Sequence, residues 1–349
     1  MKTIEPVRSP DRTGAAMASP PRTPRWQRRA VRVIVVLTAL ALAGAGLQTL
    51  AERRHAAAHP APGEHVGLAD GRRLHVQVAG EKHDGPTVLL LGGAGASVSA
   101  WGWLLPAVAE HATVVAYDRA GLGWSDPSDA GTGADAVLAD LRQALEIRGL
   151  DGPYVVVGHS LGGHYARAFA AAHPDEVSGL VLVDPSHEDQ AKALGMSSAS
   201  AAPMFTALRE LTRLGLTRLY LPPSFTHDLT YLPQPERDQA LGQMRAVGYW
   251  RTFGAEMAGL DDVGASLPTG RGAVGDIPLH VLIATGGATS ENQQEQVGIA
   301  AELRRTMEEL SSTGRTTVLP DASHVSIVTE RAHAEIIADA IVEQVEAAR

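Results

Sequence analysis

The stretch YVVVGHSLGGHYARAFA, residues 154–170, decides the fold. It places a four-residue apolar run directly before the pentapeptide GHSLG, and a helical pattern follows at once. A strand that reverses into a helix around one serine needs residues without bulk on both sides, and Gly158 and Gly162 supply them. The pattern therefore predicts that Ser160 is exposed at a sharp strand-to-helix turn.

From about residue 64, short apolar runs alternate with amphipathic stretches, which predicts an α/β domain with a mostly parallel sheet covered by helices. Strands are expected at 73–79, 87–91, 113–117, 154–158, 179–184, 279–284 and 315–319. Helices are expected at about 100–110, 134–149, 160–173, 296–312 and 331–347. The alternation stops between Asp184 and Leu279, where helix-like segments predict an inserted lid over about 188–275 at the carboxyl ends of the strands.

The N-terminal part has a different composition. Residues 1–32 contain eight Lys/Arg and two Asp/Glu and read as a disordered basic head, while residues 33–47 carry no charge. With the extension to Ala51, this apolar run predicts a transmembrane anchor with the basic head in the cytoplasm and the rest outside. A cleaved signal segment, which would make the protein secreted, and a buried core helix are the alternatives. Residues 52–63 read as a linker, and 64–349 as the folded domain.

The charge and cysteine content exclude some function classes. The chain has a net charge of −9 although its first segment is basic, so the body is acidic and is not expected to bind nucleic acid. There is no cysteine, so a disulfide, a catalytic thiolate and a cysteine-ligated metal are all excluded.

A serine hydroxyl is a poor nucleophile and needs a base to activate it. The backbone N–H of Leu161 follows Ser160 at the expected helix start, where developing negative charge is favoured. Ser160 is therefore the expected nucleophile and Leu161 an expected oxyanion donor.

The chain resembles the α/β-hydrolase family over roughly residues 64–347. Besides 158–162, the resemblance rests on LLLGGAGASVSAW (89–101), VVAYDRAGLGWSD (114–126), GLVLVDPSHED (179–189) and ASHVSIV (322–328). The layout with a basic head and an apolar segment resembles membrane-anchored members of actinobacterial type. The resemblance implies a serine hydrolase with a helical lid.

In this family the base is a histidine after the last strand. His324 fits, because it follows the expected strand at 315–319 and precedes the C-terminal helix. His333 falls within that helix pattern. His159 and His164 flank the serine and are expected to be packing residues.

The resemblance usually implies an acid after the strand at 279–284, but only Glu291 and Glu295 are available there. Some members place the acid one strand earlier, where this chain has Asp184. A carboxylate that closes an apolar strand is unfavourable to bury unless it is paired. Asp184 is therefore the favoured acid and Glu291 the alternative, while Asp118 is expected to be structural.

The second oxyanion donor is expected in the loop after 87–91, where many members have His-Gly and this chain has GGAG (92–95). By position we expect the N–H of Ala94, with Gly93 as its neighbour. A phosphate-binding loop is the alternative, but neither of the common glycine-rich phosphate motifs is present.

Together these features predict a Ser-His-Asp hydrolase that cleaves a small or lipid-like ester, or less favourably an amide or thioester, through an acyl-enzyme. No cofactor and no metal is expected. A catalytically inactive binding module for a lipid or small molecule, and an anchored protein whose insertion docks a partner, are the rival interpretations. The substrate itself cannot be read from the sequence.

Overall fold

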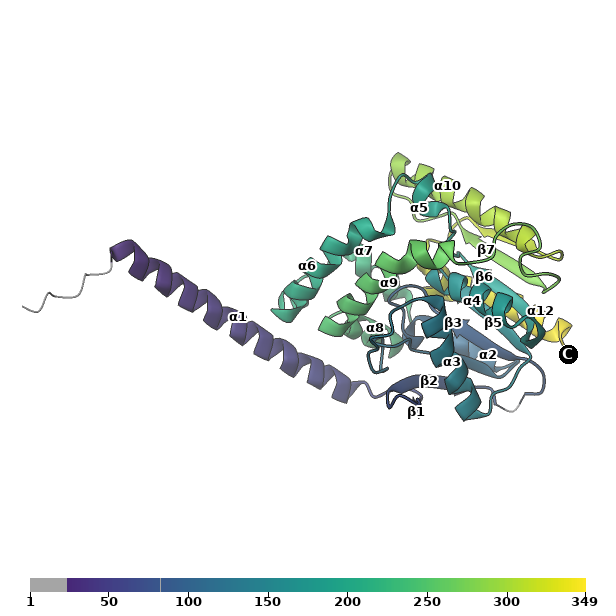
Figure 1. Ribbon diagram of the computed structural model, residues 1–349, viewed down its shortest axis with the longest axis horizontal. Coiled ribbons are helices and arrows are strands. Elements are labelled where there is room, and N and C mark those ends of the chain that lie inside the picture. The colour runs from purple at the N-terminus through teal and green to yellow at the C-terminus, as the bar shows by residue number, and fades with distance from the viewer. Residues whose placement is uncertain (1–23, 82) are drawn as a thin grey trace, which may run out of the picture. The chain divides into compact units, whose positions relative to one another are not determined.

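The computed structural model describes residues 24–81 and 83–349 (Figure 1). A sheet of eight strands has the order β1-β2-β4-β3-β5-β6-β7-β8. The strands are β1 (Glu64–Gly67), β2 (Arg73–Ala79), β3 (Thr87–Leu91), β4 (Val114–Tyr117), β5 (Tyr154–His159), β6 (Val177–Val183), β7 (Leu279–Ala284) and β8 (Arg315–Leu319). β1 and β2 pair antiparallel, as do β2 and β4, and the remaining pairs are parallel.

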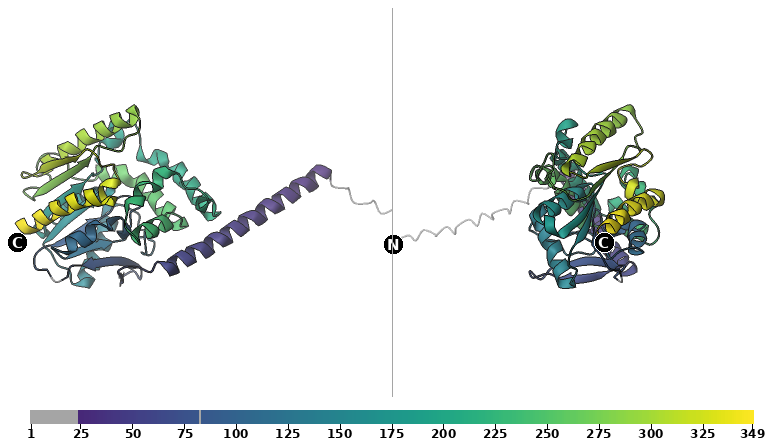
Figure 2. Two further views of the ribbon diagram at one scale, coloured as in Figure 1. Left: turned by 180° about the vertical axis from the view of Figure 1, so that it is seen from behind. Right: turned by 90° about the vertical axis from the view of Figure 1, so that its right-hand side faces the viewer.

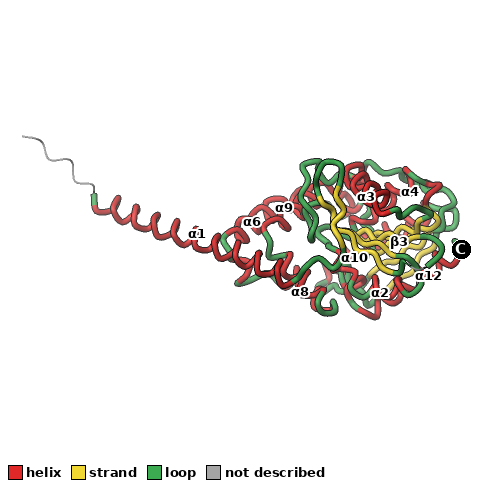
Figure 3. Tube along the Cα trace, turned by 90° about the horizontal axis from the view of Figure 1, so that it is seen from below, coloured by secondary structure: helices red, strands yellow, loops and turns green. Residues whose placement is uncertain are grey.

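Helices cover both faces of the sheet (Figure 3). One face packs against α3 (Ala134–Arg148), α4 (Leu161–Ala172) and α10 (Glu291–Thr306), and the other packs against α2 (Leu104–Ala109) and α12 (Arg331–Ala347). Figure 2 shows α12, in yellow, lying along its face of the sheet. Strand residues alternate between the two cores, with Leu89 and Leu91 in one and Val88 and Leu90 in the other. A strand covered on both faces is apolar along nearly its whole length, which explains the continuous run VLLL at 88–91.

The helical insertion lies between β6 and β7. Its helices are α5 (Gln190–Ala193), α6 (Ala202–Arg213), α7 (Pro223–Thr226), α8 (Glu236–Gln243) and α9 (Val247–Ala265), with short 3₁₀ turns η3 (Ser198–Ala201), η4 (Leu216–Arg218) and η5 (Asp228–Tyr231) between them. Phe205, Met244 and Trp250 form the centre of a separate apolar cluster within it. The predicted α/β class with a lid is therefore confirmed.

Several predicted boundaries differ from the structure. The first strand, β1, was not predicted, because it is a four-residue edge strand with a single buried side chain, Val66. The helix predicted at 296–312 begins at Glu291, since Ser290 caps it by accepting the N–H of Gln293, and it gives way to a 3₁₀ turn at Met307.

The N-terminal segment is more helical than predicted. Helix α1 runs over Arg25–Ala58, so residues 25–32 of the expected disordered head and 52–58 of the expected linker are helical. Residues 1–23 of the head lie outside the described residues. Alanine, arginine and glutamate in ERRHAAA are strong helix formers and extend the apolar helix. By length and composition α1 could cross a membrane, and its apolar window is not buried by protein. The chain divides into two compact units after Ala43, so residues 44–58 belong to the same unit as the folded domain.

Candidate active site

Ser160 lies between the end of β5 and the start of α4, in a backbone conformation with φ 54° and ψ −121°. Positive φ is unfavourable for a residue with a side chain and persists only where the surroundings enforce it. Ser160 N donates to Val183 O over 3.2 Å, and Ser160 O accepts from Gly163 and Ser186 N–H groups. A Cβ on Gly162 would collide with the carbonyl oxygen of Leu91, so the turn can form only with glycine there.

His324 lies in the loop between β8 and α11 (Ser326–Thr329). Its Nε2 is 2.9 Å from Ser160 Oγ, and its Nδ1 is 2.5 Å from Asp184 Oδ2. The structure thus brings together the predicted nucleophile, base and acid from three loops at the carboxyl ends of parallel strands. The His324 side chain is 46% exposed, so the group is open to solvent.

Asp184 follows β6 and is buried, with a left-handed φ of 39°. Its Oδ1 accepts the N–H of Ala284 over 2.8 Å and lies 3.2 Å from Nη1 of Arg304. Burial by itself would raise the pKa of Asp184, but the hydrogen bond and charge of His324 and the charge of Arg304 hold the pKa below its usual range. The carboxylate is therefore ionised and able to orient an imidazolium.

Arg304 is a member of the site that the sequence analysis missed. It is buried on α10, and its Nε donates to Pro185 O over 2.8 Å. A signal was available, because Arg304 shares the apolar face of the helix with Ala300 and Ala301, and an arginine on such a face needs a buried partner.

The other predicted candidates lie elsewhere. Glu291 and Glu295 are exposed in the first turns of α10, and the Nδ1 of His324 faces Asp184 instead. Asp118 is fully buried and accepts from Val98 N–H and Trp124 N–H, and its Oδ2 lies 2.7 Å from His75 Nδ1, which fits a structural role.

His159 and His164 are both buried, as expected for packing residues. His159 Nε2 lies 2.8 Å from the carbonyl oxygen of His324, so the ring holds the base's loop rather than facing Ser160 Oγ. Burial, with the nearby charge of His324, lowers the pKa of His159 to about 3; burial, with that of Arg167, lowers the pKa of His164 to about 3.

The loop after β3 lies against the serine turn. A Cβ on Gly93 would be 3.0 Å from Ser160 Cβ. The Gly95 N–H donates to Glu256 Oε2 over 2.7 Å, so it is already engaged. Gly93 and Ala94 remain the candidate donors from this loop, and Leu161 remains the candidate donor from the start of α4.

A buried ion pair fixes this loop to the lid. Arg119 donates from Nη1 to Gly92 O and from Nη2 to Gly93 O, each over 2.6 Å, and from Nε to Glu256 Oε1 over 2.7 Å. Glu256 lies on lid helix α9 and both side chains are buried. Three backbone groups of the loop are thus held by one pair of charges, which sequence reasoning did not find because the partners are far apart in the chain.

Aromatic side chains of the lid lie over the same loop. A Cβ on Gly95 would be 2.8 Å from Tyr249 Oη and 3.0 Å from Phe253. Both rings pack with Trp250, which also contacts Phe225. The lid therefore places aromatic side chains over this loop, next to the buried carboxylate of Glu256.

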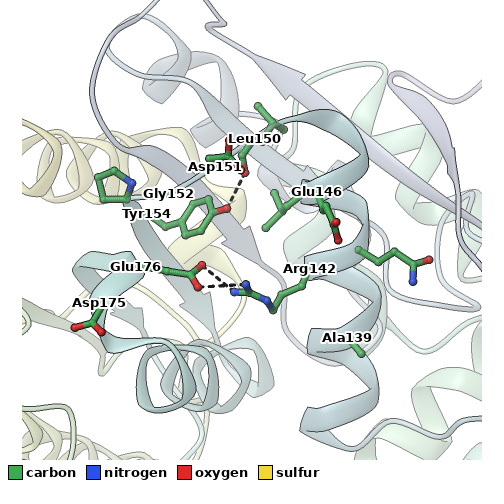
Figure 4. Close-up of a pocket in the computed structure, with 12 residues that line it drawn as sticks. Ala139, Arg142, Glu146, Leu150, Asp151, Gly152, Tyr154, Asp175 and Glu176 are labelled. Carbon is green, nitrogen blue, oxygen red and sulfur yellow. Dashed lines mark hydrogen bonds and ion pairs between the residues drawn. The ribbon is translucent and has the colours of Figure 1, made fainter.

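A surface hollow of about 840 Å³ lies away from this group (Figure 4). It is lined by α3, by the start of β5 at Tyr154 and by Glu176, which pairs with Arg142 over 2.8 Å. Tyr154 begins β5, the strand that ends before Ser160. The hollow therefore lies at the amino ends of the parallel strands, opposite the candidate active site at their carboxyl ends.

Comparison with known proteins agrees with this fold. Residues 88–340 match the Alpha/beta hydrolase family, and the chain belongs to that family. An uncharacterized protein of Mycobacterium tuberculosis is 30% identical over 201 residues, covering 52% of this chain and 58% of the relative. A soluble epoxide hydrolase of Corynebacterium is 34% identical over 120 residues, covering 34% of this chain and 41% of the relative. The chain thus spans less than two thirds of the length of these relatives.

Among solved structures, a thermophilic esterase from Thermogutta terrifontis has a TM-score of 0.58 at 21% identity, covering 82% of this chain and 99% of its own. An epoxide hydrolase, CorEH, has a TM-score of 0.54 at 19% identity, with coverages of 82% and 99%. At such identities the likeness shows the fold alone. Family membership supports hydrolase activity. The kind of bond that is cleaved has to be inferred from the residues of the site.

Proposed function

We propose that the protein is a serine hydrolase that cleaves carboxylic esters through an acyl-enzyme on Ser160. The observation that carries the proposal is the continuous chain from Ser160 Oγ through the imidazole of His324 to the buried, ionised Asp184. A nucleophile, a base within hydrogen-bond reach and a group that orients the base are the requirements of this chemistry.

In the proposed reaction, Ser160 Oγ attacks the ester carbonyl carbon and its proton passes to His324 Nε2. The N–H groups of Leu161 and Ala94 stabilise the oxyanion of the tetrahedral intermediate, a contribution of about 3 kcal/mol per donor in other enzymes. Collapse expels the alcohol, which takes the proton from Nε2. A water molecule then attacks the acyl-enzyme by the same route and releases the acid.

One feature favours ester hydrolysis over epoxide opening, and a second favours an ester with an apolar acyl part. The nucleophile is a serine, whereas epoxide-opening members of this fold use a carboxylate at the same turn. The lid residues Tyr249 and Phe253 beside the oxyanion loop are aromatic and suit an acyl chain.

The test is labelling and turnover with the full-length protein. A fluorophosphonate should label Ser160, and p-nitrophenyl esters of graded chain length should be hydrolysed faster than the matched amides and thioesters. Ser160→Ala should abolish both, while Ser312→Ala, at an exposed serine, should leave both unchanged. Labelling that survives Ser160→Ala would overturn the mechanism, and a folded protein with neither labelling nor turnover would indicate a binding module.

The proposal includes an anchor formed by α1, with the domain outside the cytoplasmic membrane. Support comes from the unburied apolar window of α1 and from the arginines at 25, 28, 29 and 32 that precede it. Fractionation should recover the protein with membranes. A mature N-terminus near Leu47 would instead show a cleaved signal segment and a secreted enzyme.

A further inference from the structure

The lid carries a cluster of exposed apolar side chains, which we call the lid edge. It lies over α6, η4 and the residues that follow, and its members are Met204, Leu211, Leu214, Leu216, Leu219 and Tyr220. The described residues outside α1 have ten exposed large apolar side chains, and these six of them fall within residues 204–220. Leu219 is 83% and Tyr220 69% exposed. Exposed apolar side chains gathered in one part of a surface are a feature of interaction sites.

The lid edge is adjacent to α1 at residues 44–48, within one compact unit of the structure. Gln48 is only 2% exposed: its Oε1 accepts from Arg218 Nε and its Nε2 donates to Arg245 O, each over 2.7 Å. A Cβ on Gly215 would lie 3.3 Å from Gly44 O, so the two backbones are in close contact. The helix from residue 44 to residue 52 is therefore docked on the lid.

The same turns of α1 are where its apolar segment ends. Leu47 and Leu50 are exposed apolar residues, and Glu52, Arg53 and Arg54 follow Ala51 directly. If α1 spans a bilayer, the boundary between acyl chains and water falls within these turns, since charged side chains leave the hydrocarbon. Residues 214–218, which contact residues 44 and 48, then lie at the depth of that boundary.

Charge near the lid edge suits a lipid surface. Arg53 and Arg54 are exposed at the end of the apolar segment. Arg213, beside Leu214, is also exposed and is ion-paired with Glu210 over 2.9 Å. Apolar side chains flanked by arginines are the pattern of segments that lie in the headgroup region, where the cations bind anionic lipid.

The apolar surface continues from the lid edge into the lid interior. Leu221, next to Tyr220, packs on the cluster of Phe205, Met244 and Trp250. The same cluster includes Phe253, which lies over the oxyanion loop at Gly95.

We propose that the lid edge lies in the headgroup region of the bilayer that holds α1, and that the enzyme takes acyl-chain esters directly from that bilayer. The inference rests on the proposed anchor and the proposed ester hydrolysis. It adds a membrane-contacting surface and a substrate class, a membrane-resident lipid ester.

The absence of native cysteine allows single nitroxide labels in the full-length protein, reconstituted in vesicles of phosphatidylcholine with a minor fraction of phosphatidylglycerol. Labels at Leu219→Cys, at Leu42→Cys in the apolar segment and at Ile147→Cys on α3 are compared for collisions with oxygen and with a water-soluble nickel chelate. The ratio of oxygen collisions to nickel-chelate collisions is expected to be several-fold higher for the label at 219 than for the label at 147, which remains in water. An aqueous label at 219 with a lipid-buried label at 42 overturns the inference, whereas an aqueous label at 42 overturns the anchor. Spin–spin broadening at 219 indicates a second copy of the chain instead of lipid and also overturns it.

Kinetics give the second readout. Leu216→Ser/Leu219→Ser/Tyr220→Ser changes exposed side chains, so the fold should be kept. Hydrolysis of a long-chain ester presented in the vesicles should fall roughly ten-fold or more, since the transfer free energy of the apolar side chains is lost. Hydrolysis of a short-chain soluble ester should be unchanged. An equal effect on both substrates would overturn the inference. If the parent protein hydrolyses neither ester, the proposed function is wrong, and the label experiment still tests whether the lid edge contacts the bilayer.

Discussion

The imidazole Nδ1 of His324 lies 2.5 Å from the Oδ2 of Asp184, a carboxylate that closes the strand next to the one before Ser160. The other oxygen of the same carboxylate is occupied by the N–H of Ala284 and by Arg304. Oδ1 is thus engaged by two donors, and Oδ2 faces the imidazole of His324. This geometry agrees with the assignment of Asp184 as the acid, which remains a prediction.

Asp184→Asn should lower kcat by about three to four orders of magnitude, because the amide keeps the packing but favours the wrong tautomer of His324. Glu291→Gln, on an exposed side chain, is the matched control and should be nearly silent. Steady-state kinetics with a p-nitrophenyl ester measure both. A large loss in the Glu291 variant with a mild effect at 184 would reverse the assignment.

Glu256→Gln should lower both stability and kcat. The change leaves the Arg119 charge buried without its partner, so the free energy of unfolding should fall by about 3 kcal/mol. It also loosens the loop of Gly93 and Ala94, so kcat should fall more than KM changes, because those amides act in the transition state.

Glu188→Gln is the control for this prediction. Glu188 pairs with buried Arg167 over 2.6 Å but does not bond the oxyanion loop. The Glu188→Gln variant should be less stable than the parent protein but keep its kcat. Urea unfolding measures the stability of both variants, and steady-state kinetics measure their kcat. Equal losses of kcat in the two variants would refute a positioning role of Glu256.

Gly162→Ala should destabilise the fold by more than about 2 kcal/mol, because its Cβ would meet the backbone oxygens of Leu91 and Gly92. Gly298→Ala, at an exposed position of α10 with open space around it, should stabilise by about 0.5 to 1 kcal/mol. Urea midpoints compare the two, and a neutral Gly162 variant would contradict the close approach of α4 to the loop after β3.

Acid should destabilise the protein through its buried histidines. Burial, with the charge of Arg167, lowers the pKa of His164 to about 3 from an ordinary value of 6.5. Between these values the unfolded chain binds a proton that the folded chain does not, so the free energy of unfolding decreases as pH falls below 6.5. The contribution of one such histidine approaches about 1.4 kcal/mol per pH unit and levels off near the folded pKa.

His164→Gln removes this contribution, so its unfolding temperature should fall less steeply than that of the parent between pH 6.5 and about 5. His111→Gln, at an exposed position, should keep the parent slope. Parallel slopes for His164→Gln and the parent would show that this histidine is not buried in its neutral form.

The local chemistry of the chain determined the strand-to-helix turn at Ser160, the alternation of strands and helices, and the lid. Glycine spacing and apolar periodicity act between neighbours in the chain, so they leave a pattern that can be read directly. The preference for Asp184 over Glu291 was also formed at this level, from the family resemblance and because a carboxylate at the end of an apolar strand needs a partner, and it remains a prediction.

Only the tertiary structure decided which groups hold the site. Arg304 reaches Asp184, Glu256 reaches Arg119, and Gln48 reaches Arg218 across 120, 137 and 170 residues of chain respectively. A pairing between two single charged or polar side chains has no periodicity, and each partner by itself resembles any surface residue. Such contacts follow from the packing of complete elements against one another, which composition and local pattern do not contain.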